Sequence, residues 1–241
     1  MSNNHLLLEV QDVSKMKLYH CYSNMARQLR SNRELFRAVF GFDPPEASRG
    51  QYWDWTTLAL RGSMIRHCRV GMEVLDMGCG AYAVLARFAR ARFACKSITA
   101  VDMCKDVIDF ASKSDSTSLI SYHHSDLFDC GLGLFDIIVF NAPYLMEQKA
   151  EQLGMIQDEE FRERFCGGAD GGATIRRFLA DCPKHLKDDG LVLLGVNHYH
   201  IKAEVIQAAI SRSGLKPVDI SYNHFTKACV YALRMKSNAK M

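Results

Sequence analysis

The sequence predicts an α/β fold in which helices cover both faces of a doubly wound, mostly parallel sheet of seven strands. Short apolar runs alternate with helical stretches of roughly ten residues from Val70 onward, which is typical of parallel strands joined by helices. The first of these runs ends in a glycine turn, "LDMGCG". The last two runs, within "KPVDISYNHFTKACVYALRMK", have no helix between them and predict an antiparallel pair.

The elements of the sheet domain are predicted in order from their patterns. The five parallel strands are expected in "MEVLDM", "SITAVDM", "LISYHHSDL", "FDIIVFNAPY" and "GLVLLGVNHYH". The helices between them are expected in "AVLARFARARFA", "KDVIDFASKS", "GATIRRFLADCPKHL" and, after the fifth strand, "KAEVIQAAISRSG". Connections between neighbouring parallel strands should be right-handed crossovers.

The first 65 residues have a different pattern and predict a helical cap. Met25, Leu29, Phe36 and Phe40 recur at helical spacing with arginines between them, and "GFDPPEASRG" then interrupts the helix. A further helix is expected in "YWDWTTLALRGSMIRHC". We therefore expect a cap or substrate-selecting segment over residues 1–65 and the sheet domain over residues 66–241.

The composition is that of an ordinary globular protein. The chain has 241 residues, of which 48% are apolar and 24% charged, and its net charge of +3 does not by itself imply a polyanionic partner. No long apolar run or basic leader predicts a membrane helix or a signal peptide, so no membrane partner is expected. The nine cysteines include no C-x-x-C pair, which favours free thiols and a cytoplasmic location.

Acidic residues follow three successive strands of the predicted sheet. Ligands of open parallel sheets bind outside the carboxyl ends of the strands, where Asp76, Asp102 and Asp126 are expected. Gly78 and Gly80 let the backbone approach a ligand closely. A glycine pair alone is weak support, because any turn from a strand to a helix can contain one, but the three acids together predict a nucleotide-like ligand.

The glycine turn does not fit NAD. It reads "GCGAYA", with Ala83 where the last glycine of G-x-G-x-x-G would stand. The chain instead resembles the Rossmann-like (class I) S-adenosylmethionine-dependent methyltransferases, and among them the HemK-type N-methyltransferases, which modify the side-chain amide of a glutamine. The likeness rests on "DMGCGAY", Asp102, "SDLF", "FDIIVFNAPY" and "CGGADGG", and it covers roughly Val70 to His200.

The resemblance implies which residues hold the cofactor, S-adenosylmethionine. The methionine end would lie along the glycine turn, the ribose at the second strand and the adenine after the third. The residues implied are Asp76, Gly78 and Gly80 for the methionine end, Asp102 and Met103 for the ribose, Asp126 and Leu127 for the adenine, and Asn141 at the junction with the acceptor.

The resemblance also implies that the segment Asn141, Ala142, Pro143 and Tyr144 carries the catalysis. A planar nitrogen is a poor nucleophile because its lone pair is delocalised. The Asn141 side-chain oxygen and the Ala142 carbonyl can each accept one of its N–H bonds, and both bonds strengthen as positive charge grows on the nitrogen. Tyr144 can stack on the acceptor, and no general base is assigned.

Three departures from the family pattern bear on this expectation. Ala142 replaces the first proline of the tetrapeptide, so Asn141 no longer precedes a proline, although Ala142 itself still does. Tyr82 stands at the third glycine position, where it either covers the cofactor or displaces the following helix. The helical module that holds the family's protein substrate has no evident match in the first 65 residues, which favours a small-molecule acceptor.

Several aromatic residues have two open interpretations. Trp53 and Trp55 in "YWDWTT" are either core anchors or walls of the acceptor pocket. His198 and His200 share one face of a strand end, as a pair of metal ligands would, but no third ligand is evident and we expect them to face the substrate, with no metal bound. Glu151 to Phe165 is expected to be a lid or, alternatively, a connecting helix.

The sequence thus predicts an S-adenosylmethionine-dependent N-methyltransferase that acts on a planar nitrogen, an amide, guanidine or similar group, of a small molecule or a protein side chain. The alternative is a nucleic-acid base methyltransferase acting on adenine N6 or guanine N2, since four basic residues could contact phosphates: Arg87, Arg90, Arg92 and Lys96. A further alternative is an inactive cofactor-binding scaffold protein.

Overall fold

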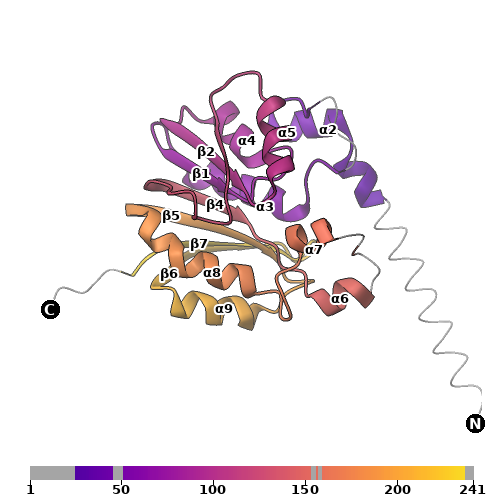
Figure 1. Cartoon of the computed structure of the whole chain (residues 1–241), viewed down its shortest axis with the longest axis vertical. Coiled ribbons are helices and arrows are strands. Elements are labelled where there is room, and N and C mark those ends of the chain that lie inside the picture. The colour runs from indigo at the N-terminus through magenta and orange to yellow at the C-terminus, as the bar shows by residue number, and fades with distance from the viewer. Residues whose placement is uncertain (1–24, 46–50, 153–155, 157–158, 237–241) are drawn as a thin grey trace, which may run out of the picture. The chain divides into compact units, whose positions relative to one another are not determined.

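The computed structural model describes residues 25–45, 51–152, 156 and 159–236, and Figure 1 gives the element labels. The chain divides into two compact units, residues 1–54 and 55–241. The division therefore precedes helix α3 (Trp55–His67), whereas the sequence placed it after residue 65. The reason is that α3 buries Thr56, Leu60 and Met64 and packs on the sheet of the second unit.

The first unit contains a helical stretch over residues 25–30 and helix α2 (Arg33–Phe40). The Asn32 side chain caps α2 by accepting a hydrogen bond from the Leu35 amide at 2.8 Å, and Gly41 ends it with φ of 82°. The aromatic rings that pack on one another in this unit are Phe36, Phe40, Phe42, Tyr52 and Trp53.

The second unit is built on a seven-stranded sheet in the order β3-β2-β1-β4-β5-β7-β6. The strands are β1 (Glu73–Met77), β2 (Ser97–Asp102), β3 (Ser121–His124), β4 (Phe135–Asn141), β5 (Leu186–Asn197), β6 (Leu215–Tyr222) and β7 (Ala228–Met235). The first five pair in parallel, and β7 runs antiparallel to both β5 and β6. The predicted fold class and the antiparallel pair are confirmed, and the structure places this pair at one side of the sheet.

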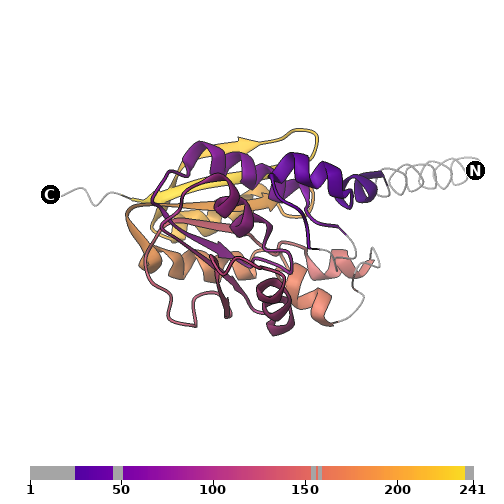
Figure 2. The ribbon, with the colours of Figure 1, turned by 90° about the horizontal axis from the view of Figure 1, so that it is seen from above.

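Helices lie on both faces of this sheet (Figures 1 and 2). Helices α3, α4 (Val84–Arg92) and α5 (Lys105–Lys113) lie on one face, and α8 (Ala173–Asp181) and α9 (Ala203–Arg212) on the other. Helices α6 (Glu147–Gln152) and α7 (Glu159–Phe165) and the 3₁₀ turn Cys182–His185 complete the unit. The predicted lid segment is therefore helical at both ends, and none of the described helices is long and apolar enough to cross a membrane.

Burial is nearly continuous along the central strands β1 and β4 and along β5 from Gly190 onward, as expected for a sheet covered on both faces. Phe140 packs against Phe178 of α8 at 4.7 Å between ring centroids. On the opposite face, a Cβ at Gly195 of β5 would stand 2.7 Å from side-chain atoms of Thr56 and Leu60. The absence of a side chain at Gly195 thus lets α3 lie close to the sheet.

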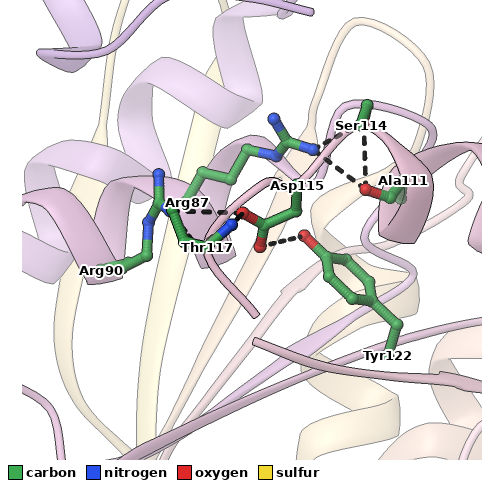
Figure 3. Close-up of polar contacts among 7 residues, drawn as sticks. All are labelled: Arg87, Arg90, Ala111, Ser114, Asp115, Thr117 and Tyr122. Atoms are coloured by element: carbon green, nitrogen blue, oxygen red, sulfur yellow. Dashed lines mark hydrogen bonds and ion pairs between the residues drawn. The ribbon is translucent and has the colours of Figure 1, made fainter. Parts of the chain in front are cut away.

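A polar cluster joins α4 to the end of α5 and to β3 (Figure 3). The buried Arg87 guanidinium donates to the Ala111 carbonyl at 3.0 Å and to Ser114 Oγ at 2.7 Å. Arg90 pairs with Asp115 at 3.3 Å, and the Tyr122 hydroxyl donates to the same carboxylate at 3.2 Å. These basic side chains serve the packing of the helices, because each has a partner inside the fold.

Candidate active site

The strand order places the candidate site at the carboxyl ends of the central strands. The order reverses between β1 and β4, and open α/β sheets bind ligands at such a switch point. Asp76 of β1 stands beside Ala100 of β2 and Val139 of β4. Asp102 and Asn141 therefore follow at the same end of the sheet as the glycine turn.

The glycine turn is tied to the end of β2. Gly78 and Gly80 have φ of 61° and 65°, a left-handed conformation that favours glycine. A Cβ at Gly78 would lie 3.2 Å from the Phe140 ring, whereas one at Gly80 would have no atom within 4 Å. The amides of Gly80 and Cys104 each donate to a different oxygen of the Asp102 carboxylate, both at 3.0 Å. Each oxygen keeps a further lone pair, so the carboxylate can still accept from ligand hydroxyls.

Asp76 has a structural partner as well as a place at the site. The N-cap of α4 is Ala83, which has no side chain able to cap, and the Ala86 amide donates to Asp76 Oδ2 at 2.8 Å instead. The pKa of the Asp76 carboxyl is raised to about 7, mainly by burial; the bond from Ala86 lowers this pKa and the charge of Asp102 raises it. A cation near Asp76 would favour its ionised form.

The residues implied for the adenine end follow β3. Asp126 is half-buried and pairs with Arg177 of α8 at 2.8 Å. Leu127 is buried with φ of 51°, and its carbonyl accepts a hydrogen bond from Ser125 Oγ at 3.0 Å. The Met103 carbonyl accepts one from His124 Nε2 at 2.9 Å, while the Met103 side chain is exposed.

Tyr82, at the third glycine position of the family pattern, packs edge-on against Phe110 of α5 with ring centroids 6.3 Å apart. Ala83 follows in the left-handed conformation and begins α4. The tyrosine side chain, at a position where the family has glycine, is thus accommodated by packing against α5. Whether the Tyr82 ring also covers a cofactor stays a prediction.

The acceptor motif continues directly from β4. Asn141 Nδ2 donates to Thr57 Oγ1 of α3 at 3.3 Å, and the Asn141 side-chain oxygen is buried. The Ala142 amide donates to the Gly195 carbonyl at 3.3 Å, which extends the pairing of β4 with β5 by one residue. The Tyr144 hydroxyl lies 3.1 Å from Thr56 Oγ1.

A glycine loop supports the backbone of this motif from the other side. A Cβ at Gly167 would stand 2.7 Å from the Pro143 carbonyl oxygen, and one at Gly171 only 2.5 Å from that of Tyr144. The Gly167 amide also donates to the Leu145 carbonyl at 2.9 Å. The sequence identified this "CGGADGG" segment by resemblance, but only the structure shows that its glycines allow this close approach.

The two histidines after β5 have different surroundings. His198 Nδ1 lies 3.0 Å from the Ile201 carbonyl oxygen and Nε2 lies 2.9 Å from the Tyr231 hydroxyl. Both ring nitrogens thus have partners within the fold, one in the turn after β5 and one on β7, and a role of His198 toward the substrate stays a prediction. The His200 ring instead lies nearly parallel to that of Tyr144, at 6.0 Å and 22°.

The two tryptophans belong to different units of the chain. Trp53 belongs to the first unit, where its ring packs against Phe40 at 6.1 Å, and the half-buried Trp55 begins α3. That either tryptophan forms a wall of the acceptor pocket stays a prediction.

Within the described ranges, no group of three or more His, Cys, Asp or Glu residues is arranged to hold a metal ion, and the cysteines there are all free.

Sequence relatives support the resemblance over half of the chain. A ribosomal protein uL3 glutamine methyltransferase of Bradyrhizobium diazoefficiens is 33% identical over 139 residues, which is 54% of this chain and 42% of that one. A putative protein N5-glutamine methyltransferase of Methanocaldococcus jannaschii is 34% identical over 122 residues, 50% of this chain and 59% of that one. The chain spans about half the length of the curated relatives it matches. No protein-family model matches the chain.

Solved structures share the fold. A methyltransferase from Pyrococcus furiosus superposes with a TM-score of 0.61 at 18% identity, covering 88% of this chain and 96% of that one. The ribosomal protein L11 methylase of Lactobacillus delbrueckii subsp. bulgaricus gives a TM-score of 0.56 at 18% identity, covering 75% and 79%. The chain therefore has the Rossmann-like fold of class I S-adenosylmethionine-dependent methyltransferases, and its sequence relatives over about half of its length are protein glutamine methyltransferases of the HemK type.

Proposed function

We propose that this protein is an S-adenosylmethionine-dependent N-methyltransferase whose acceptor is the side-chain amide of a glutamine in a protein. One observation carries the proposal. The motif from Asn141 to Tyr144 begins at the carboxyl end of β4, beside the glycine turn of β1 and at the switch point of the sheet. A planar nitrogen and a methyl donor bound there would be neighbours.

The residues at the strand ends fit the proposed cofactor. Gly80 has open space on its Cβ side, Asp102 keeps lone pairs for ribose hydroxyls, and the Asp76 carboxyl suits a cationic amino group. Asp126 and Leu127 would lie beside the adenine. When bound, S-adenosylmethionine supplies a methyl group on a positively charged sulfur.

The acceptor motif would act by orientation and charge stabilisation. The Asn141 side-chain oxygen and the Ala142 carbonyl would accept the two N–H bonds of the glutamine amide and direct its remaining electron density at the methyl group. Both acceptors bind more tightly as the nitrogen becomes positive, so the transition state gains more than the ground state. Because the Asn141 oxygen is buried, the atoms that cover it must move when the acceptor arrives.

The names of the sequence relatives favour a protein as the acceptor, whereas the sequence alone favoured a small molecule. One relative is named as a ribosomal protein uL3 glutamine methyltransferase, and another, 28% identical over 138 residues, is a release factor glutamine methyltransferase of Streptococcus pneumoniae. The nucleic-acid alternative is weakened by the polar contacts of the basic residues. Arg87 and Arg90 bond within the fold, and Lys96 pairs with Glu73 at 2.8 Å, so these three do not form a free basic surface.

The test is methyl transfer from labelled S-adenosylmethionine to purified ribosomal protein uL3 and to a purified release factor, with the modified residue located by mass spectrometry. We expect one methyl group on one glutamine, and none after that glutamine is changed to alanine. Label in RNA would favour the nucleic-acid alternative. Cofactor binding without transfer to either protein, to RNA or to a metabolite extract would favour the inactive scaffold.

A further inference from the structure

We propose that Thr56 and Thr57, in the first turn of α3, are positioning residues that hold the acceptor motif in its working geometry; the inference rests on the proposed function. Both threonines are buried, with 0% and 8% of their surface exposed. Thr57 Oγ1 accepts from Asn141 Nδ2 at 3.3 Å, and Thr56 Oγ1 lies 3.1 Å from the Tyr144 hydroxyl. Two adjacent residues thus contact both polar side chains of the motif.

The Asn141 amide turns its NH2 group toward Thr57 on α3. Only the amide oxygen can accept an N–H bond from a methyl acceptor, and an amide rotated by 180° would turn its own N–H groups toward those of the acceptor. With the NH2 group bonded to Thr57 on the α3 side, the side-chain oxygen of Asn141 points to the opposite side. A threonine hydroxyl can donate as well as accept, so Thr57 does not choose between the two amide orientations. The bond instead anchors the one that the chemistry needs, in which Asn141 Nδ2 is the donor.

This side-chain contact compensates for the substitution in the tetrapeptide. In N-P-P-Y, the residue after the asparagine is a proline, which restricts the backbone of the asparagine. Here Ala142 follows Asn141, so that restraint is absent. The bond from Asn141 to Thr57 provides a restraint through the side chain instead.

The other threonine fixes the aromatic residue of the motif. With its hydroxyl against Thr56 and its ring nearly parallel to His200, Tyr144 is held at both its polar tip and its face. Gly195 makes this arrangement possible, because a Cβ there would stand 2.7 Å from Thr56 Cγ2 and would push α3 away from the strand.

The variants Thr57→Val and Thr56→Val remove one hydroxyl at nearly constant volume, and Thr57→Ser and Thr56→Ser restore it. We expect each valine variant to lower kcat for methylation of the protein acceptor by about tenfold or more, since small displacements of reacting groups are costly. The Kd for S-adenosylmethionine by calorimetry and the Tm should stay near those of the wild type. The serine variants should recover most of the lost kcat.

A second measurement does not depend on activity. The two side-chain NH2 protons of Asn141 can be observed by NMR in uniformly ¹⁵N-labelled protein and assigned by their loss in Asn141→Asp. We expect their signals to shift and to exchange faster with water in Thr57→Val, but not in Thr57→Ser. Unchanged signals in Thr57→Val would overturn the positioning role of Thr57, whether or not the wild type methylates the tested proteins.

The kinetic outcomes separate the two proposals. No transfer by the wild type to either protein defeats the proposed function, while the NMR result still decides whether Thr57 orients Asn141. Wild-type kcat in both valine variants would overturn the inference. So would a parallel loss of Tm, cofactor affinity and kcat that serine does not recover, because that pattern describes only a structural role.

Discussion

The Gly80 amide donates to Asp102 Oδ2 at 3.0 Å and thereby joins the glycine turn after β1 to the end of β2. The other oxygen of the same carboxylate accepts from the Cys104 amide at 3.0 Å, at the start of α5. One buried side chain therefore organises two of the loops that the proposed cofactor would contact. These loops are arranged by the protein's own hydrogen bonds.

Replacing Asp102 should weaken cofactor binding. Asp102→Ala removes both loop contacts and the proposed ribose acceptor, and we expect the Kd for S-adenosylmethionine to rise at least about tenfold, the loss of roughly one charge-assisted hydrogen bond. Calorimetry measures this directly. Asp106→Ala, an exposed carboxylate in the first turn of α5, is the matched control and should bind normally. Unchanged affinity in Asp102→Ala would show that the ribose is placed wrongly.

Asn141→Ala should separate binding from turnover. The cofactor should bind nearly as in the wild type, because the loop contacts of Asp102 are intact, while kcat should fall by a factor on the order of 10² or more, as after loss of one oxyanion-hole donor. Equilibrium binding and single-turnover methyl transfer measure the two effects. A variant that keeps its turnover would remove the asparagine from the proposed mechanism.

Cofactor affinity should depend on pH through Asp76. Its pKa of about 7 leaves much of the carboxyl protonated below neutrality, and a bound cationic amino group favours the carboxylate. Affinity should therefore rise between about pH 6 and pH 8, with release of a proton that calorimetry in buffers of different ionisation enthalpy detects. In Asp76→Asn the proton release should disappear. Proton release that persists in this variant would point to another group.

The same carboxyl should affect stability in the opposite direction. The folded protein holds the Asp76 proton more tightly than the unfolded chain does, because the ordinary pKa is 3.8. Its contribution to the free energy of unfolding is fully present below that value and is lost as the pH rises through about 7. Urea unfolding of the cofactor-free protein at several pH values should show this decline, and Asp76→Asn should flatten it. An equal slope in both proteins would contradict the assignment.

Gly171→Ala should lower the free energy of unfolding more than the same substitution at Gly131 does. Gly171 and Gly131 have similar φ values, 76° and 72°, so alanine brings the same backbone strain of about 1–2 kcal/mol to each. Only at Gly171 would the new Cβ meet a backbone atom, the Tyr144 carbonyl oxygen at 2.5 Å, whereas Gly131 has nothing within 4 Å. For Gly171→Ala alone, we expect the free energy of unfolding to fall by a further amount of about 1–3 kcal/mol, and turnover to be reduced. Equal urea stability and equal turnover of the two variants would refute the contact.

The amino-acid sequence alone was enough to predict the sheet, its parallel and antiparallel parts, and the positions of the acids and of the tetrapeptide at strand ends. These features follow from local patterns. Apolar runs and helical periodicity define the elements, and glycines mark the turn after β1. The residues of each strand define where that strand ends. The sequence alone therefore predicts that Asp76, Asp102 and Asn141 lie together at the carboxyl ends of the strands.

The side chains that contact the motif, and the partners of the basic residues, could not be predicted from the sequence because they depend on tertiary packing. Thr57 and Asn141 are 84 positions apart, and Thr56 and Tyr144 are 88 apart, so no local pattern links them. Their contact depends on how closely α3 packs against β5, which Gly195 sets. The partners of Arg87 likewise come from α5 and the turn after it. Such contacts depend on how separately formed elements pack together, and pattern and propensity describe each element alone.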